Sequence, residues 1–195
     1  MVYILENTYP GEACTAVVTR AGKLVQSFVG APILIDAADL GAAAHRVRLF
    51  WSNMLPPAVL QAALPKLLPP SPTLATILQS YHLPTRPRQN DHFPFARQNR
   101  VGAARVCLPT LVSYLQSNAF RRKANGSLGE GQIFNITTRV YEEPDVIEKE
   151  MLLGFQPNST YVAGVSREQR AIRLGRAQDG STMAWLGAFL HASNK

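Results

Sequence analysis

Three short apolar runs, separated by helix-like and turn-like segments, constrain the fold of this chain more than any other feature. Each run has the length of a buried strand; they are residues 2–5, 32–35 and 47–51. Residues 12–29 lie between the first two runs and carry apolar side chains at helical spacing; these are Val17, Ala21, Leu24 and Phe28. Gly30 and Pro32 end that helix. The order strand, helix, strand predicts an α/β sheet that is packed by helices.

Composition favours a folded domain with an acidic partner. The 195 residues are 46% hydrophobic and 17% charged, which suits one ordinary domain with a smaller attachment. The net charge of +7 favours nucleic acid first and an anionic membrane second. Because no apolar run approaches a membrane span and no secretory signal pattern is present, we expect an intracellular protein with no membrane partner.

The two cysteines, Cys14 and Cys107, are far apart in the sequence. No Cys-x-x-Cys pair exists, so the sequence predicts neither a zinc site nor any other metal site. It also predicts no disulfide framework, which suits a reducing compartment. We interpret both cysteines as small, mostly apolar side chains.

The composition of the sequence changes after Trp51. Prolines are dense from residue 54 to residue 87, and helices are predicted only between them, at residues 59–64 and 73–81. A basic stretch follows, with Asp91 its single acid; its cations are Arg86, Arg88, Arg97, Arg100, Arg105, Arg121, Arg122 and Lys123. Aromatic side chains are interleaved with these cations, so the stretch is a candidate for contacts to a nucleic-acid backbone, or else an ordinary solvated surface.

Regular structure is predicted again from Ile133. We expect a strand at residues 133–136, a helix at 145–153 ended by Gly154, a helix capped by Ser166, and a last helix at 182–191. The sequence therefore predicts three parts: residues 1–53 as part of an α/β domain, residues 54–135 as an insert, and residues 136–195 as a return to the first domain.

Several blocks in order resemble the animal de novo DNA cytosine-5 methyltransferases, and similar domains occur in some algal and plant mobile elements. The strongest block is residues 32–53, where an apolar strand leads through Ala-Ala-His-Arg-Val-Arg into Phe-Trp-Ser-Asn. The other blocks are Glu6-Asn7-Thr8, Thr137-Thr138-Arg139, residues 151–157 and Leu174-Gly175-Arg176 followed by Trp185-Leu186. The resemblance covers almost the whole chain except residues 53–136. It implies an incomplete Rossmann-like methyltransferase sheet with an inserted target-recognition region.

The resemblance implies roles for three residues in a pocket for a flipped cytosine. Glu6 would stabilise charge at N3 of the base, Arg48 would reach the base O2 or a nearby phosphate, and Arg46 would support the pocket. The plain alternatives are a surface glutamate that caps a turn and two solvated arginines on one side of a strand. His45 is interpreted as structural.

The resemblance also implies a partial site for S-adenosylmethionine and contacts to DNA. Gly175, Arg176, Ala177 and Gln178 match the cofactor rim, whereas Ala177-Gln178-Asp179-Gly180 departs from the family pattern, so we expect this chain to bind the cofactor weakly or not at all. The alternative is an ordinary loop before a helix. The DNA-contacting candidates are Arg97, Arg100, Arg121, Arg122, Lys123, Thr137, Thr138 and Arg139.

The family's nucleophile and its Gly-rich cofactor loop have no counterpart in this sequence. The nucleophile lies in a Pro-Cys dipeptide, and neither Cys14 nor Cys107 follows a proline. An apolar run follows Met1 directly, so we expect a partner segment upstream, or downstream in a rearranged order. Three possibilities stay open: an enzyme half that is inactive alone, a non-catalytic DNA-binding or regulatory module, and a decayed copy. A eukaryotic source would imply a nuclear protein.

Overall fold

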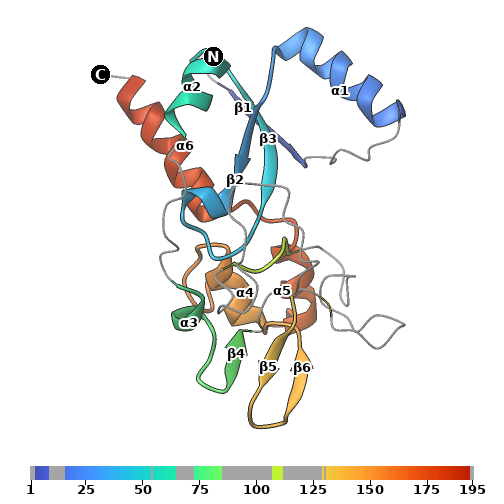
Figure 1. The fold of residues 1–195 in the computed structure, drawn as a ribbon, viewed down its shortest axis with the longest axis vertical. Helices are drawn as coiled ribbons and strands as arrows, with labels where there is room; N and C mark the ends of the chain where they lie inside the picture. The colour runs from blue at the N-terminus through green and yellow to red at the C-terminus, as the bar shows by residue number, and fades with distance from the viewer. Residues whose placement is uncertain are drawn as a thin grey trace.

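The computed structural model describes residues 3–8, 16–53, 55–64, 73–84, 107–111, 129 and 131–193. Two small sheets organise two lobes, which are stacked along the long axis of the molecule (Figure 1). The strands of the upper lobe are β1 (Ile4–Thr8), β2 (Ile33–Asp36) and β3 (Val47–Ser52). Those of the lower lobe are β4 (His82–Pro84), β5 (Ile133–Asn135) and β6 (Val140–Glu142). The α/β class predicted from the sequence is confirmed.

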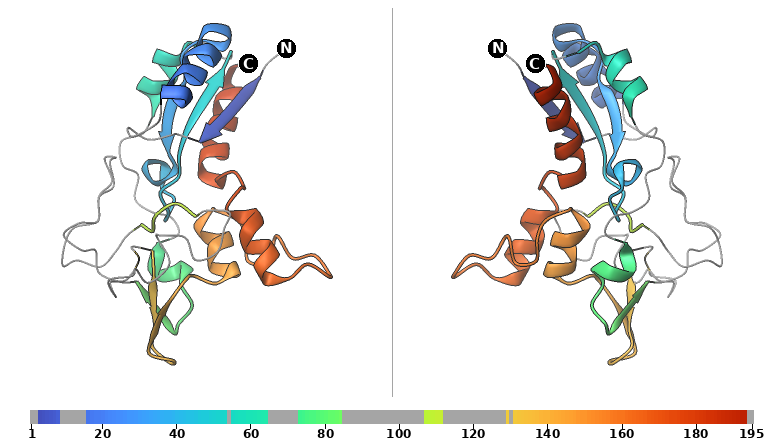
Figure 2. Two further views of the ribbon diagram at one scale, coloured as in Figure 1. Left: turned by 90° about the vertical axis from the view of Figure 1, so that its right-hand side faces the viewer. Right: turned by 90° about the vertical axis from the view of Figure 1, so that its left-hand side faces the viewer.

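Helices belong to both lobes. The upper lobe has α1 (Ala16–Val29), the short 3-10 helix η1 (Ala37–Leu40), α2 (Pro57–Ala63) and α6 (Gly180–Ser193). The lower lobe has α3 (Leu74–Ile77), α4 (Val146–Leu152) and α5 (Arg167–Leu174). The sheet of the upper lobe lies between α1 and α6, as two perpendicular views show (Figures 1 and 2).

The upper sheet has the order β1-β3-β2, and β3 is antiparallel to both neighbours. Strands β1 and β2 therefore run in the same direction, and the chain passes between them through α1. Strand β3 is antiparallel because a compact turn through η1 and Gly41, whose φ is 93°, returns the chain beside β2. A Rossmann sheet has parallel neighbours, so this arrangement differs from the Rossmann-like sheet that we expected.

Alternation along the strands forms the upper core. Ile33 pairs with Phe50 and Ile35 with Arg48, so Ile33, Ile35 and Phe50 share one face. They are buried in a cluster with Leu60 of α2 and Leu186 of α6. The side chain of Gln61 in α2 receives the Leu34 N–H at 3.2 Å and donates to the Leu34 carbonyl at 3.4 Å. This pairing covers the outer edge of β2.

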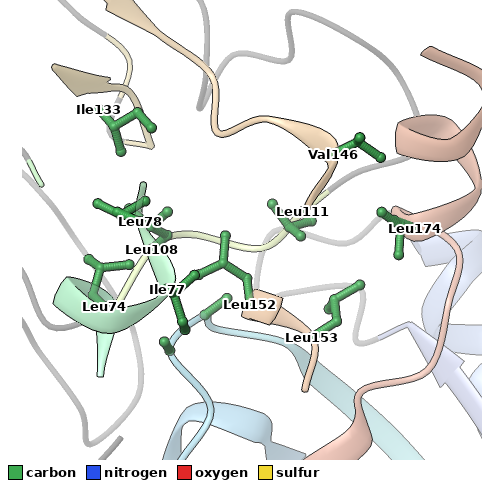
Figure 3. Packing of buried hydrophobic residues seen from close by; sticks show 12 residues of the cluster. Leu74, Ile77, Leu78, Leu108, Leu111, Ile133, Val146, Leu152, Leu153 and Leu174 are labelled. Carbon is green, nitrogen blue, oxygen red and sulfur yellow. The ribbon is translucent and has the colours of Figure 1, made fainter. Parts of the chain in front are cut away.

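The lower core gathers side chains from sequence-distant segments (Figure 3). Its buried residues are Ala43, Ala44, Leu74, Ile77, Leu78, Leu108, Leu111, Ile133, Val146, Leu152, Leu153 and Leu174. The segment 107–111 joins the lobes, because the His45 N–H donates to the Leu108 carbonyl at 2.8 Å and the Leu108 N–H donates to Ala43 at 2.9 Å. The three-part division at residues 53 and 135 stays a prediction, although residues of all three parts meet in this cluster.

Local sequence signals explain the helices of the lower lobe. Asp145 caps α4 and Ser166 caps α5, each in a reciprocal capping box with the third helical residue. Gly154 ends the α4 region with a φ of 77°. Gly180 starts α6 where a Cβ would lie 3.1 Å from the carbonyl oxygens of Leu153 and Gly154, so a larger residue would push α6 away.

Several expected elements differ from the observed ones. The third expected helix, at residues 73–81, is the single turn α3, and strands β4 and β6 were not predicted at all. Residues 12–15 of the first expected helix lie outside the described residues. The apolar face expected on that helix faces solvent in α1, where Leu24 is 60% and Phe28 is 80% exposed.

Candidate functional site

Glu6 and Arg48 form the centre of the candidate site. The Nε–H of Arg48 donates to Oε1 of Glu6 at 2.8 Å, and the two side chains are 11% and 23% exposed respectively. The amide nitrogen of Gln178 donates to the other carboxylate oxygen, Oε2, at 3.1 Å. Three residues that the sequence assigned to two different functions therefore meet at one carboxylate. Both of its oxygens have a donor.

The strand register explains why Glu6 and Arg48 meet. Glu6 lies opposite Phe50 and Thr8 lies opposite Arg48, so Glu6 and Arg48 are diagonal neighbours on one face of the sheet. A long arginine side chain spans that diagonal distance. Burial lowers the pKa of Arg48, and the adjacent Glu6 carboxylate partly offsets this by favouring the charged guanidinium.

Arg46 lies directly before β3 but serves a different set of atoms. Its guanidinium donates to the carbonyl oxygens of Leu111 and Gly175, each at 3.4 Å, and to that of Ala177. The residue is only 4% exposed, and burial lowers its pKa to about 10, with repulsion from Arg48 as the second cause. Arg46 therefore ties the start of β3 to the segment 107–111 and to the loop before α6. This geometry agrees with a supporting role rather than direct contact with a ligand.

The buried carboxylate of Asp36 holds the backbone that leads into Arg46. Asp36, at the end of β2, accepts hydrogen bonds from the Arg46 N–H at 2.9 Å, the Ala38 N–H at 3.2 Å and Nδ1 of His45 at 2.7 Å. The expectation that His45 is structural agrees with this position. Sequence reasoning gave Asp36 no role; the signal was an acid at the end of an apolar strand, nine residues before a histidine.

The predicted cofactor rim is the loop between α5 and α6. Gly175 and Ala177 are half-buried and present their carbonyls to Arg46, whereas Arg176 and Gln178 are exposed. Asp179 follows, is buried, and caps α6 by accepting the Thr182 N–H at 2.9 Å. Burial raises the pKa of Asp179. The loop thus brings one side chain, Gln178, to the Glu6–Arg48 pair and leaves Arg176 in solvent.

The other predicted DNA-contacting residues lie in the lower lobe. Thr137, Thr138 and Arg139 are exposed at the turn between β5 and β6. This turn is at the opposite end of the molecule from strand β1, which contains Glu6 (Figure 1). The side-chain oxygen of Asn135 accepts the N–H groups of Thr137 and Thr138 at 2.9 and 3.0 Å, which shapes this turn. Arg139 has a positive φ of 58°. These three residues therefore form a second cluster, apart from the Glu6 site.

Some candidates fall outside the described residues; they are Cys14, Arg97, Arg100, Arg121, Arg122 and Lys123. Cys107 is fully buried, and its thiol donates to the Ala42 carbonyl at 3.6 Å, which is the position of a core residue. Within the described segments, three or more His, Cys, Asp or Glu side chains nowhere gather in a way that could hold a metal ion. Among the helices of those same segments, none has the length and apolar character needed to cross a bilayer.

Comparison with solved structures identifies a similar fold. The structure of the Entamoeba histolytica methyltransferase EhMeth matches with a TM-score of 0.58 at 12% sequence identity. The match covers 100% of this chain and 63% of EhMeth, so the chain spans less than two thirds of that methyltransferase. No protein-family model and no curated protein matches the sequence. The chain thus has a fold similar to a large part of a methyltransferase.

Proposed function

We propose that this chain is the C-terminal half of a DNA cytosine-5 methyltransferase, and that a partner segment adds the parallel strands which would make its small antiparallel sheet part of a larger Rossmann-like sheet. The observation that carries the proposal is the meeting of Glu6, Arg48 and Gln178, which come from three sequence blocks and two assigned functions. The methyltransferase fold of EhMeth supports the class of reaction. Base and cofactor chemistry must lie close together for a methyl group to pass between them.

The proposed roles follow from the geometry of the pair. Glu6 would hold a proton at N3 of a flipped cytosine, and Arg48 would direct its guanidinium to the base O2 or to the adjacent phosphate. Arg46 would keep the rim loop in place through the carbonyls of Gly175 and Ala177. Arg48 and Gln178 each donate to one Glu6 oxygen, and each oxygen keeps a second lone pair to which the N3–H of a bound base would donate.

The rim loop, residues 175–178, offers groups for only one side of a cofactor site. Two of its carbonyls accept from Arg46 and the side-chain amide of Gln178 donates to Glu6, so the exposed side chain of Arg176 is the main group left for a ligand. S-adenosylmethionine would supply the methyl group when bound. The sequence contains no Pro-Cys dipeptide and no Gly-rich loop after an apolar strand, so the thiolate and the other side of the cofactor site must come from a partner segment.

A second candidate function is a non-catalytic DNA-binding module. The observation in its favour is that each Glu6 oxygen already accepts a hydrogen bond from within the chain, one from Arg48 and one from Gln178. In that case the exposed turn at residues 136–139 and the net charge of +7 would carry the binding.

A methyl-transfer assay separates these candidates. Residues 1–195 are incubated with labelled S-adenosylmethionine and cytosine-containing DNA, with or without a purified segment that carries the Pro-Cys dipeptide and the Gly-rich loop. We expect no turnover by residues 1–195 alone and measurable turnover by the mixture.

Two variants identify the site in the same assay. Glu6→Gln should lower turnover by about a hundredfold or more, the range typical of a lost acid or base. The control Glu168→Gln removes an exposed carboxylate in the first turn of α5 and should leave turnover unchanged. Turnover by residues 1–195 alone would contradict the half-enzyme, and equal activity of the two variants would contradict the assigned site.

A further inference from the structure

His82, the first residue of β4, is buried between two carboxylates. Its Nδ1 lies 2.6 Å from Oε1 of Glu148 in α4, and its Nε2 lies 2.7 Å from Oε1 of Glu142 in β6. The side chain of His82 is 3% exposed and that of Glu148 is 0% exposed. Sequence reasoning gave this histidine no role, because its partners are 60 and 66 residues away.

The arrangement depends on the protons of the imidazole ring. A neutral imidazole has one N–H and one lone pair, whereas an imidazolium has two N–H donors. Two carboxylates at 2.6 and 2.7 Å both require a donor, so the geometry matches the imidazolium. Loss of one proton would turn a lone pair toward a carboxylate oxygen and break one of the two contacts.

A continuous chain of hydrogen bonds leads from His82 to the turn at residues 136–139. The Glu142 oxygen that accepts from His82 also accepts the Nδ2–H of Asn135 at 2.7 Å. The other side-chain atom of Asn135 accepts the N–H groups of Thr137 and Thr138. The position of Glu142 therefore sets the rotamer of Asn135, and Asn135 sets the turn.

We propose that His82 is a proton-dependent clamp on the turn at residues 136–139, and that this clamp tunes the binding of a nucleic-acid backbone by Thr137, Thr138 and Arg139. The nucleic-acid part rests on the proposed function; the clamp itself does not. With the imidazolium in place, α4, β6 and the turn are held in one arrangement. With a neutral imidazole, β6 and the turn separate from α4.

The groups around His82 support the protonated form. Burial lowers the pKa of His82, but the hydrogen bonds and charges of Glu148 and Glu142 outweigh it, so the pKa is raised above its usual 6.5. The hydrogen bond from Asn135 is the main cause that lowers the pKa of Glu142, and that from His82 adds to it. The ring centroids of Tyr81 and His82 are 4.4 Å apart in an edge-on arrangement. Asp145 accepts a hydrogen bond from the Gln79 side chain, and the positive charge of Arg167 partly offsets the rise in the pKa of Tyr81.

The direction of the pH dependence follows from these shifts. A histidine with a raised pKa stabilises the fold fully below its unfolded pKa, and this contribution is lost as pH rises through the folded pKa. Glu142 sets the other limit, since its contribution is lost as pH falls through its lowered pKa. The clamp is therefore closed between the folded pKa of Glu142 and that of His82, and it opens as pH rises through the folded pKa of His82.

The test uses NMR on residues 1–195 to follow the titration of the His82 ring. In the same samples it measures hydrogen exchange of the Thr137 and Thr138 amides, corrected for the intrinsic pH dependence of exchange. His82 should titrate above 6.5, and protection of both amides should fall about five- to tenfold across the same titration, as expected for two coupled sites. Duplex DNA binding, measured by fluorescence anisotropy at constant salt, should weaken by a similar factor.

Substitutions at Glu142 and His82 test the clamp directly, and an exposed histidine provides the control. Glu142→Gln keeps the shape of the partly exposed Glu142 and can donate to a neutral imidazole, so it should lower the His82 pKa and remove the pH dependence of the turn. His82→Gln should remove it as well. His191→Asn, an exposed histidine on α6, is the control and should leave the titration unchanged.

The outcomes separate the two proposals. Titration of His82 at or below 6.5, or amide protection that ignores that titration, would overturn the clamp. Protection that follows His82 without DNA binding at any pH would support the clamp and overturn the proposed function. DNA binding that weakens with His82 in the wild type and H191N, but not in E142Q, would support both.

Discussion

The Nε–H of Arg48 and Oε1 of Glu6 are 2.8 Å apart although 42 residues separate them in sequence. The antiparallel pairing of β1 with β3 creates this contact by placing the two residues diagonally on one face. The contact is the geometric basis for treating the two residues as one site. It also has a stability that can be measured without any substrate.

A double-mutant cycle should detect that coupling. We expect Glu6→Gln and Arg48→Gln to show a coupling of about 0.5–1 kcal/mol in urea denaturation, because the pair is only partly buried and water screens it. The coupling should shrink as salt rises. Additive effects of the two substitutions would show that the ion pair does not persist in solution.

The paired strands and capped helices were largely predictable because their signals are local. Short apolar runs indicated β2 and β3, and Asp145 and Ser166 each start a helix in which the third residue completes a capping box. The six-residue strand β3 carries the two positions, Arg48 and Phe50, that face Thr8 and Glu6. Once the strands are known, the alternation of side chains along each strand determines which residues share a face of the sheet.

Other features depend on contacts between distant residues and carry no local signal. Strands β4 and β6 have three residues each and are strands only because both pair with β5. Alternation places Arg46 and Arg48 on one side, but the carbonyls that Arg46 contacts lie up to 131 residues away. The antiparallel direction of β3 depends on the compact turn at Gly41, and the sequence pattern of strand and helix did not indicate that direction.

Arg46→Met should destabilise the fold strongly. The substitution leaves three carbonyls, those of Leu111, Gly175 and Ala177, without their donor in a buried place. We expect a loss of about 3 kcal/mol in the free energy of unfolding, measured by urea denaturation. The control is Arg176→Met, on an exposed neighbour of the same loop, and it should change stability by less than about 0.5 kcal/mol. Similar losses for both variants would mean that Arg46 does not hold the loop.

Glu150 should be a stability determinant of the lower lobe with a defined pH dependence. It is fully buried and accepts Arg170 Nη2 at 2.6 Å and the N–H groups of Asn158 and Thr160 at 2.6 and 3.0 Å. Burial raises its pKa, but the hydrogen bond from the Thr160 hydroxyl, followed by those from Arg170 and the two N–H groups, outweighs it and leaves the pKa below 4.5. Its contribution is therefore present above 4.5 and lost as pH falls through the folded pKa.

Glu150→Gln should accordingly lower the free energy of unfolding by about 3 kcal/mol at neutral pH, because Arg170 is left as an uncompensated buried charge. At a pH below the folded pKa of Glu150, the difference from the wild type should largely vanish. Urea denaturation at both pH values measures this. Glu168→Gln, on an exposed carboxylate of α5, should match the wild type at both; a pH-independent loss in E150Q would contradict the assigned ionisation.

Arg139 should contribute to DNA affinity through phosphate contact. Its exposed side chain lies in the turn of the β5–β6 hairpin, where a single added cation releases about one counterion on binding. Arg139→Gln should weaken binding uniformly across DNA sequences and reduce the slope of log affinity against log salt by about 1. Binding isotherms over a salt series measure both. Affinity of the wild type that is flat between low and physiological salt would contradict an electrostatic interface.

The exposed apolar face of α1 should cause self-association of the isolated chain. Leu24 and Phe28 lie one helical turn apart and Val25 lies beside them, and all three face solvent. Water-exposed apolar patches of this kind favour association, because burial of their surface is favourable at about 25 cal/mol per Å². We expect sedimentation velocity to show a concentration-dependent increase in mass.

Phe28→Glu should suppress this self-association, since burial of an unpaired carboxylate is costly. Gln26→Glu adds the same charge on the opposite side of α1 and should leave the association nearly unchanged. Equal suppression by both variants would assign the effect to net charge rather than to the apolar face.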